Sequence, residues 1–148
     1  MDKKELATYY HDLGFNCAQS VFAAFSEITG ISPETSLTIA GGFGGGLRQG
    51  EVCGAAAGAI MAIGAIFPFC DANSGDSKVR IAALTVKFLS LFREKCGALT
   101  CRDLLGCDTS TPEGAKKNSE EGIVKRLCPN IIHNAVESVE DILAKESK

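Results

Sequence analysis

The stretch from Gly41 to Phe69 limits the possible folds of this chain more than any other. Positions 41–46 hold five glycines and one phenylalanine, and a sixth glycine follows at position 50. Glycine has no Cβ to penalise a positive φ, and it loses much conformational entropy when it is ordered in a helix. We therefore expect a loop here, held close to another part of the backbone.

The glycine loop is followed by Cys53 and then by an unbroken run of small and apolar residues. Gly54 and Gly58 share one face of a helix, so another backbone can approach that face closely. Ala62 and Ala65 continue the same face. Because a helix that is apolar on all sides is buried on all sides, the sequence predicts a central core helix with Cys53 at its N-terminal end.

The same stretch also has to be weighed as a membrane segment. Val52 to Phe69 is an apolar run of 18 residues, which is the lower limit for a membrane-spanning helix. It consists mostly of alanine and glycine, and it lacks basic flanks and an aromatic belt. We expect a buried helix in a protein that is not embedded in a membrane.

The rest of the chain shows caps and helical periodicity, and no alternating β pattern. We expect an all-α fold, a single-domain (1–148) multi-helix bundle around the buried Ala/Gly-rich central helix. The segment from Asp108 to Asn118 reads as a flexible surface loop. The other expected helices are Lys3–Leu13, Cys17–Ile28, one opened by Ser32-Pro33 and ending near Ala40, one capped by Ser77 and ending near Lys95, Cys101–Leu105, a short one from Ser119 or Glu120 through Leu127, and a last one starting at Cys128-Pro129.

Composition narrows the classes of partner. The formal net charge of the 148 residues is -3, so the chain has no basic footprint and we expect no nucleic-acid binding. The first residues are charged and amphipathic rather than an apolar signal sequence. We therefore expect a cytoplasmic protein, where cysteines stay reduced unless they bind metal or do redox work.

The seven cysteines divide by their expected place in the helices. A helix N-terminus carries a partial positive charge and unpaired N–H groups, which stabilise a thiolate and lower the pKa of a thiol. Four cysteines fall at expected N-termini and are candidate nucleophiles or metal ligands: Cys17, Cys53, Cys101 and Cys128. Three fall at or past expected C-termini and read as small buried hydrophobic residues: Cys70, Cys96 and Cys107. We expect the first four sulfurs in one pocket beside the glycine loop, and the other three outside it.

The residues from Cys53 to Gly58 read CGAAAG and match a CGAxxG signature. With this signature and its cysteine placement, the chain resembles the C_GCAxxG_C_C family of redox-active proteins over nearly its whole length. The places of that family's four characteristic cysteines are taken here by Cys17, Cys53, Cys101 and Cys128. The resemblance implies redox activity at these residues. Split-Soret cytochromes contain a similar domain with which an iron–sulfur centre is associated, although this chain lacks their haem motifs.

Several functions remain open for the four cysteines. No C-x-x-C pair is present, so spacing alone does not name a ligand. The first hypothesis is electron transfer to an unknown redox partner through an iron–sulfur cluster bound by Cys17, Cys53, Cys101 and Cys128. The second is a thiol–disulfide protein in which the same cysteines work without metal, and the third is a structural zinc site. The last is a non-catalytic interaction module that forms a homodimer through its apolar helices. Whether the protein is an enzyme stays undecided.

Other residues give weaker signals. The glycine loop lacks the Gly-Lys-Ser/Thr ending of a phosphate-binding loop, and its N–H groups are better suited to point at sulfur. Arg48 is a candidate partner for a thiolate or cluster, with a surface salt bridge as the alternative. His11 and His133 are isolated histidines, for which we expect structural or solvent-exposed roles.

Overall fold

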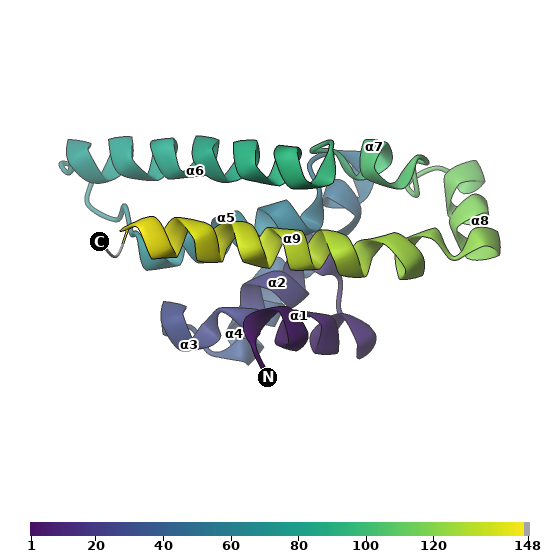
Figure 1. Cartoon of the computed structure of the whole chain (residues 1–148), viewed down its shortest axis with the longest axis horizontal. Coiled ribbons are helices and arrows are strands. Elements are labelled where there is room, and N and C mark those ends of the chain that lie inside the picture. Colours follow the sequence, from purple (N-terminus) through teal and green to yellow (C-terminus); the bar gives the residue numbers. More distant parts are fainter. Residues whose placement is uncertain (147–148) are drawn as a thin grey trace.

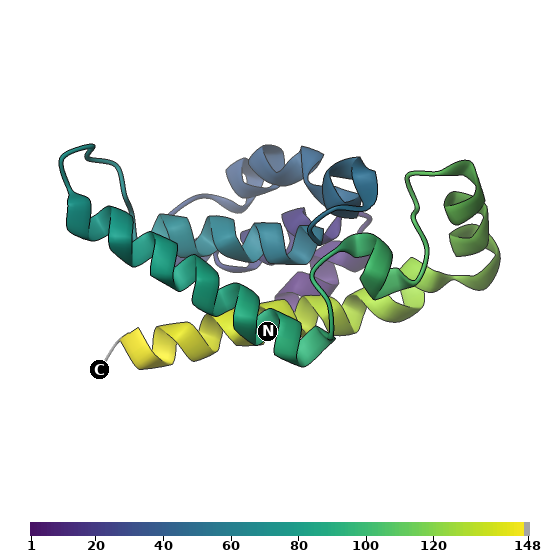
Figure 2. The same cartoon turned by 90° about the horizontal axis from the view of Figure 1, so that it is seen from above.

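Two long antiparallel helices lie side by side along the molecule in the computed structural model, which describes residues 1–146 (Figure 1). They are α6 (Gly75–Cys96) and α9 (Ile123–Glu146). The central helix α5 (Gly54–Ile66) packs against both of them and, on its other side, against α2 (Cys17–Ala24). The remaining helices are α1 (Lys3–Asp12), α3 (Ser26–Thr29), α4 (Pro33–Ile39), α7 (Cys101–Leu105) and α8 (Pro112–Glu121), with α7 and α8 at one end of the molecule (Figure 2).

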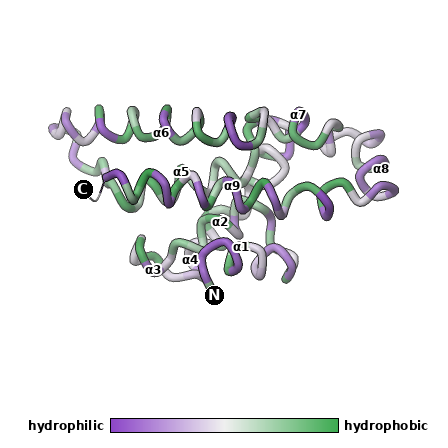
Figure 3. Tube along the Cα trace, viewed as in Figure 1, coloured by the Kyte–Doolittle hydropathy of each residue, from purple (hydrophilic) through white to green (hydrophobic). Residues whose placement is uncertain are grey.

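This architecture confirms the all-α fold class. In the described residues, β pairing is limited to one isolated antiparallel bridge between Val52 and Thr100. No residue of α5 is exposed, as its apolar surface on all sides predicts. The long helices are amphipathic instead, and hydrophilic and hydrophobic residues alternate along α6 and α9 (Figure 3). They place Phe88, Phe92 and Ile132 in the core around α5.

The small-residue face of α5 lets α2 approach closely. A Cβ at Gly58 would collide with the carbonyl oxygen of Ala18, and a Cβ at Gly54 would lie 2.5 Å from Cys17 Sγ. Glycine at these two positions therefore permits the crossing of the two helices. As a result, the N-termini of α2 and α5 lie next to each other.

Two expected helix boundaries in the first half of the chain were wrong. The helix expected over Cys17–Ile28 is broken at Phe25, where φ is -99° and ψ is 11°, so that α2 ends at Ala24 and α3 follows. The cap of α6 is Ser74 rather than Ser77, because the Ser74 hydroxyl accepts the N–H of Ser77 and helix geometry begins at Gly75.

The region from 108 to 128 differs more from the expectation. The segment expected to be a flexible loop contains most of α8, which Thr111 caps and Pro112 opens. The last helix begins at Ile123, directly after Gly122 at φ +60°, and Pro129 lies inside it. Cys128 is therefore not at a helix N-terminus, which corrects the placement expected from the Cys128-Pro129 pair.

None of the helices over residues 1–146 has both the length and the apolar character that crossing a membrane requires. The apolar α5 has only 13 residues, because Phe67 leaves the helical conformation with φ -119° and ψ 71°.

Candidate functional site

Cys17 is held at the first position of α2 by a capping box. The Asn16 side chain accepts the N–H of Gln19 at 2.9 Å, and the Gln19 side chain accepts the N–H of Asn16 at 2.9 Å. The Asn16 amide also donates to the carbonyl oxygen of Gly41 at 3.0 Å. These bonds fix the start of α2 against the glycine loop.

Cys53 and Cys101 are brought together by a short backbone pairing that the sequence did not reveal. The N–H of Cys53 donates to the carbonyl oxygen of Leu99 at 2.8 Å, and the N–H of Cys101 donates to that of Glu51 at 2.7 Å. This pairing surrounds the bridge between Val52 and Thr100, so the start of α7 lies beside the start of α5.

The glycine loop contains the short turns η1 (Ala40–Gly42) and η2 (Gly46–Gly50) and covers the site with an unusual backbone. Four consecutive residues are left-handed, with φ of 62° at Gly45, 62° at Gly46, 60° at Leu47 and 58° at Arg48. A side chain at Gly46 would collide with the backbone of Glu51. Because a left-handed residue other than glycine costs on the order of 1–2 kcal/mol, Leu47 and Arg48 hold this conformation against strain.

The four candidate cysteines gather beside this loop. Cys17, Cys101 and Cys128 line a cavity of about 320 Å³ together with Gly45 and Arg48. Cys53 is 5% exposed, and its thiol is hydrogen-bonded to Cys17 Sγ. The four side chains come from α2, the residue before α5, α7 and α9, so only the tertiary fold assembles them.

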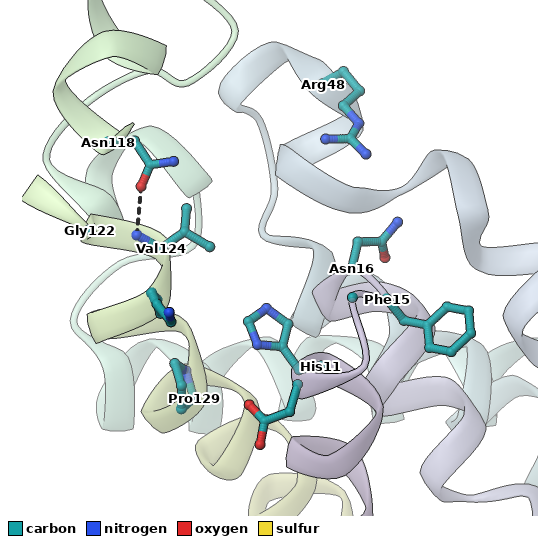
Figure 4. A pocket seen from close by; sticks show the side chains of 11 residues that line it. His11, Phe15, Asn16, Arg48, Asn118, Gly122, Val124 and Pro129 are labelled. Atoms are coloured by element: carbon teal, nitrogen blue, oxygen red, sulfur yellow. Dashed lines mark hydrogen bonds between the residues drawn. The ribbon is translucent and has the colours of Figure 1, made fainter. Parts of the chain in front are cut away.

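The cavity adjoins a wider cleft of about 550 Å³ (Figure 4). Five residues line both spaces: His11, Asn16, Arg48, Asn118 and Val124. In Figure 4, Arg48 approaches from the glycine loop, His11 and Asn16 from the α1–α2 side, and Asn118 and Val124 from the α8–α9 side. The cleft thus provides a route from the surface to the cysteine cavity.

Cys17 is the thiol that the surroundings favour as a thiolate. Its pKa is lowered from 9.0 to about 7, above all because the Cys53 thiol donates a hydrogen bond to it. Burial acts against this shift, while the backbone N–H groups of Gly45, Ala18 and Cys17 itself support it. The helix N-terminus and the glycine loop therefore stabilise negative charge on the same sulfur.

The other three thiols are held neutral. The pKa of Cys53 is raised well above 9.0, first by its hydrogen bond to Cys17 and then by burial. Burial, followed by the charge of Cys17, raises the pKa of Cys101 to about 11 and that of Cys128 to about 12. Of the four candidate thiols, only Cys17 therefore has a lowered pKa. The hydrogen bond to Cys17 and then burial raise the pKa at Cys53, burial is the main cause at Cys101, and the buried Cys128 lies inside α9 with no helix N-terminus beside it.

The remaining cysteines lie in three different places. Cys70 is exposed between α5 and α6. Cys96 ends α6 and accepts a hydrogen bond from the Asn134 amide at 3.6 Å, and burial raises the pKa of its thiol. Cys107 does not line the cavity, but it packs against the small cluster that contains Cys101, so it lies nearer the site than expected.

The two histidines have different surroundings. His133 Nε2 lies 2.7 Å from Thr8 Oγ1 and links α9 to α1, a structural role. His11 lines the cavity and the cleft, and burial lowers the pKa of its imidazole. The lining residues Thr109, Ala115 and Asn118 were missed, because the segment containing them was read as a loop. Thr111-Pro112 was the available signal, since it is a cap followed by proline.

The four candidate cysteines can be compared with the ligands that zinc and an iron–sulfur cluster require. Over residues 1–146, no three histidine, cysteine, aspartate or glutamate side chains are grouped as a metal ion requires. This arrangement gives no support to a single zinc ion held by the four sulfurs. Three soft thiols line the cavity and Cys53 adjoins one of them, Cys17; cysteine thiols are the ligands that iron–sulfur clusters use.

Comparison with known proteins identifies one family. The family model described as "Putative redox-active protein (C_GCAxxG_C_C)" matches residues 15–142, which confirms the resemblance found in the sequence. The matched region includes all four site cysteines. The searches of curated proteins and of solved structures gave no match.

Proposed function

Because the chain belongs to the C_GCAxxG_C_C family of redox-active proteins, we propose that it carries out thiol–disulfide exchange, with Cys17 as the attacking thiol and Cys53 as its resolving partner. One observation carries this proposal: Cys17 lines the cavity, and its pKa is lowered above all by the neighbouring Cys53 thiol. The two residues are neighbours at the starts of α2 and α5, where a Cβ at Gly54 would lie 2.5 Å from Cys17 Sγ, so the fold favours a disulfide between them.

The accessibility of the two thiols sets the order of the reaction. Cys17 lines the cavity, so a substrate can reach it, whereas Cys53 is 5% exposed and does not line the cavity. The Cys17 thiolate attacks one sulfur of a substrate disulfide, forms a mixed disulfide and releases the other sulfur as a thiolate. Cys53 then gives up its proton to the departing thiolate and attacks Cys17 Sγ. The products are a Cys17–Cys53 disulfide and two reduced substrate thiols, a balanced two-electron exchange.

A cytoplasmic location suits this chemistry. A reducing compartment returns the Cys17–Cys53 disulfide to two thiols, and it keeps an exposed cysteine such as Cys70 reduced. The redox partner in this proposal is a small-molecule or protein dithiol that reaches Cys17 through the cleft.

Electron transfer through an iron–sulfur cluster is a second candidate, and the position of Cys101 and Cys128 favours it. A two-thiol mechanism leaves both without a part, although they line the same cavity as Cys17. Cys17, Cys53, Cys101 and Cys128 would hold the cluster, which when bound would supply one-electron transfer. The N–H groups of Gly45 and Ala18, which donate to Cys17 Sγ, would offset the negative charge of the ligands.

A thiol titration combined with metal analysis tests the proposal. Protein produced under cluster-forming conditions and purified without oxygen should contain no stoichiometric iron. In a redox buffer of a small-molecule disulfide and its dithiol, it should lose two thiols per molecule. Cys17→Ser and Cys53→Ser should each abolish this loss, whereas Cys70→Ser, at an exposed position outside the cavity, should leave it unchanged. A brown protein with iron at cluster stoichiometry that Cys101→Ser removes would instead establish the second candidate.

A further inference from the structure

Arg48 lines the same cavity as Cys17 and has a left-handed backbone conformation, which is unfavourable for arginine. It has φ 58° and ψ 20°, and it follows Leu47, which is also left-handed. Its side chain folds back toward the loop, because a Cβ built at Gly45 would lie 3.6 Å from Arg48 Cδ and 3.8 Å from Arg48 Nη1. Gly45 is also the residue whose N–H group donates to Cys17 Sγ. The loop thus places a cation on the wall of the cavity that the attacking thiol also lines.

The guanidinium of Arg48 has no acidic partner within residues 1–146. It lines both the cysteine cavity and the wider cleft, and its side chain points into the cleft in Figure 4. The other charged side chains that line the cleft are Asp12 and Lys125, and His11 is the remaining titratable group. Arg48 and Lys125 outnumber Asp12, so the approach to Cys17 favours an anion.

We propose that Arg48 is a specificity residue that binds the carboxylate of a small anionic disulfide and so places its S–S bond against Cys17. The inference rests on the proposed thiol–disulfide function and names its substrate class. An arginine can hold a carboxylate through two parallel hydrogen bonds, which fixes the orientation of the bound molecule as well as its position. The cavity volume of about 320 Å³ restricts the substrate to a small molecule.

Two disulfide probes that differ in charge test this role. Dithiobis(nitrobenzoate) carries a carboxylate on each ring, whereas dithiodipyridine is neutral. The measured quantity is the rate at which the free Cys17 thiol disappears with each probe, whether as an adduct or as the Cys17–Cys53 disulfide, followed by thiol blocking and mass spectrometry at constant pH. In Arg48→Gln we expect the rate with the anionic probe to fall roughly fivefold to tenfold at low salt, from the loss of one nearby unit charge. The rate with the neutral probe should stay within about twofold, because Arg48 is not among the groups that lower the pKa of Cys17.

Control variants separate the loss of the Arg48 charge from an effect of the substitution on folding. Arg48→Gly removes the charge and relieves the left-handed strain, so it should lose the same discrimination in a protein at least as stable. Arg93→Gln removes another exposed arginine, on α6 and outside both spaces, and it should change neither rate. High salt should abolish the preference of the unmodified protein for the anionic probe.

The outcomes distinguish this inference from the function on which it rests. If Cys17 reacts with the neutral probe but Arg48→Gln and Arg48→Gly slow both probes equally, the role of Arg48 is wrong and the thiol function stands. If Cys17 of the unmodified protein reacts with neither probe, the proposed function itself is overturned.

Discussion

At the scale of single residues, Cys17 and Cys53 act as one unit. The proton that stays on Cys53 is the same proton that stabilises negative charge on Cys17, so the low pKa of one thiol and the high pKa of the other have a common cause. This pairing gives a nucleophile that lines the cavity and a protonated, buried resolving thiol. The backbone N–H groups of Gly45 and Ala18 also lower the pKa of Cys17, but by less than the Cys53 thiol does.

This dependence predicts how the reactivity of Cys17 changes with pH. The rate of its reaction with a neutral disulfide should rise with pH around a midpoint of about 7, because only the thiolate attacks. Cys53→Ala removes the largest cause of the lowered pKa, so the midpoint should move to higher pH. The measurement is the rate at which the free Cys17 thiol disappears over a pH series, by thiol blocking and mass spectrometry, in the unmodified protein and in the variant.

Cys101→Ala is the matched control for that experiment. Cys101 has a pKa of about 11 and is uncharged near neutral pH, so its removal should leave the midpoint of Cys17 in place. A midpoint that does not move in Cys53→Ala, or that moves equally in Cys101→Ala, would show that the hydrogen bond does not set the pKa of Cys17.

The sequence predicted which cysteines gather but not how they differ. The helix expected to start at Cys17 and the CGAxxG signature pointed to Cys17 and Cys53, and the structure places Cys17 against the start of α5. The division of the pKa values between them depends on which sulfur faces which N–H groups, and no local pattern encodes that. Cys128 was placed in the right group for a wrong reason, because it lies inside α9 rather than at its start.

At the scale of elements, the crossing of α2 and α5 builds the site. Gly54 and Gly58 let the two helices approach until Cys17 touches the start of α5. The run of small residues made this close crossing predictable, although it did not show which helix would use the face.

Two alanine substitutions on α5 test the crossing. In Gly58→Ala the new Cβ would collide with the backbone of Ala18, so we expect a loss of roughly 1–3 kcal/mol in the free energy of unfolding. Gly64→Ala on the same helix has no atom within 4 Å of the new Cβ, and the better helix propensity of alanine should add about 0.5–1 kcal/mol. Denaturant unfolding measures both values. Equal effects of the two substitutions would contradict the close approach.

Two of the element boundaries that sequence analysis missed, the starts of α8 and α9, have separate physical reasons. Thr111-Pro112 is the same start signal as Ser32-Pro33, which was recognised, but it opens a segment rich in charged and polar residues that reads as a loop. Pro129 was read as a helix start, since proline usually lies there. In α9, the helix instead begins after Gly122, where the Asn118 side chain accepts the N–H of Val124 at 2.8 Å.

At the scale of the whole molecule, the redox site joins the two halves of the chain. Cys17 and Cys53 belong to the first half, while Cys101 and Cys128 come from α7 and α9. The antiparallel pairing of residues 51–53 with 99–101 connects them, and helix periodicity could not predict it. The identity of the cavity-lining residues therefore required the tertiary structure.

Oxidation should also change the stability of the whole fold. A Cys17–Cys53 disulfide closes a loop of the unfolded chain that contains α2, α3 and α4, and loop entropy predicts a gain of up to about 4 kcal/mol in the free energy of unfolding. Denaturant unfolding of oxidised and reduced protein measures the difference. Cys53→Ala treated with the same oxidant should show no gain. A less stable oxidised form would mean that the bond strains the contact between α2 and α5.

The central claim, that Cys17 and Cys53 form the reactive pair, is tested most directly by mapping the disulfide. The full-length protein, purified without oxygen, is oxidised with a small-molecule disulfide in a disulfide/dithiol redox buffer, its free thiols are blocked, and its peptides are analysed by mass spectrometry. We expect one disulfide between Cys17 and Cys53, with the thiols of Cys70, Cys96, Cys101, Cys107 and Cys128 blocked as free thiols. A protein in which Cys17 stays free, or in which it pairs mainly with Cys101 or Cys128, would contradict the account.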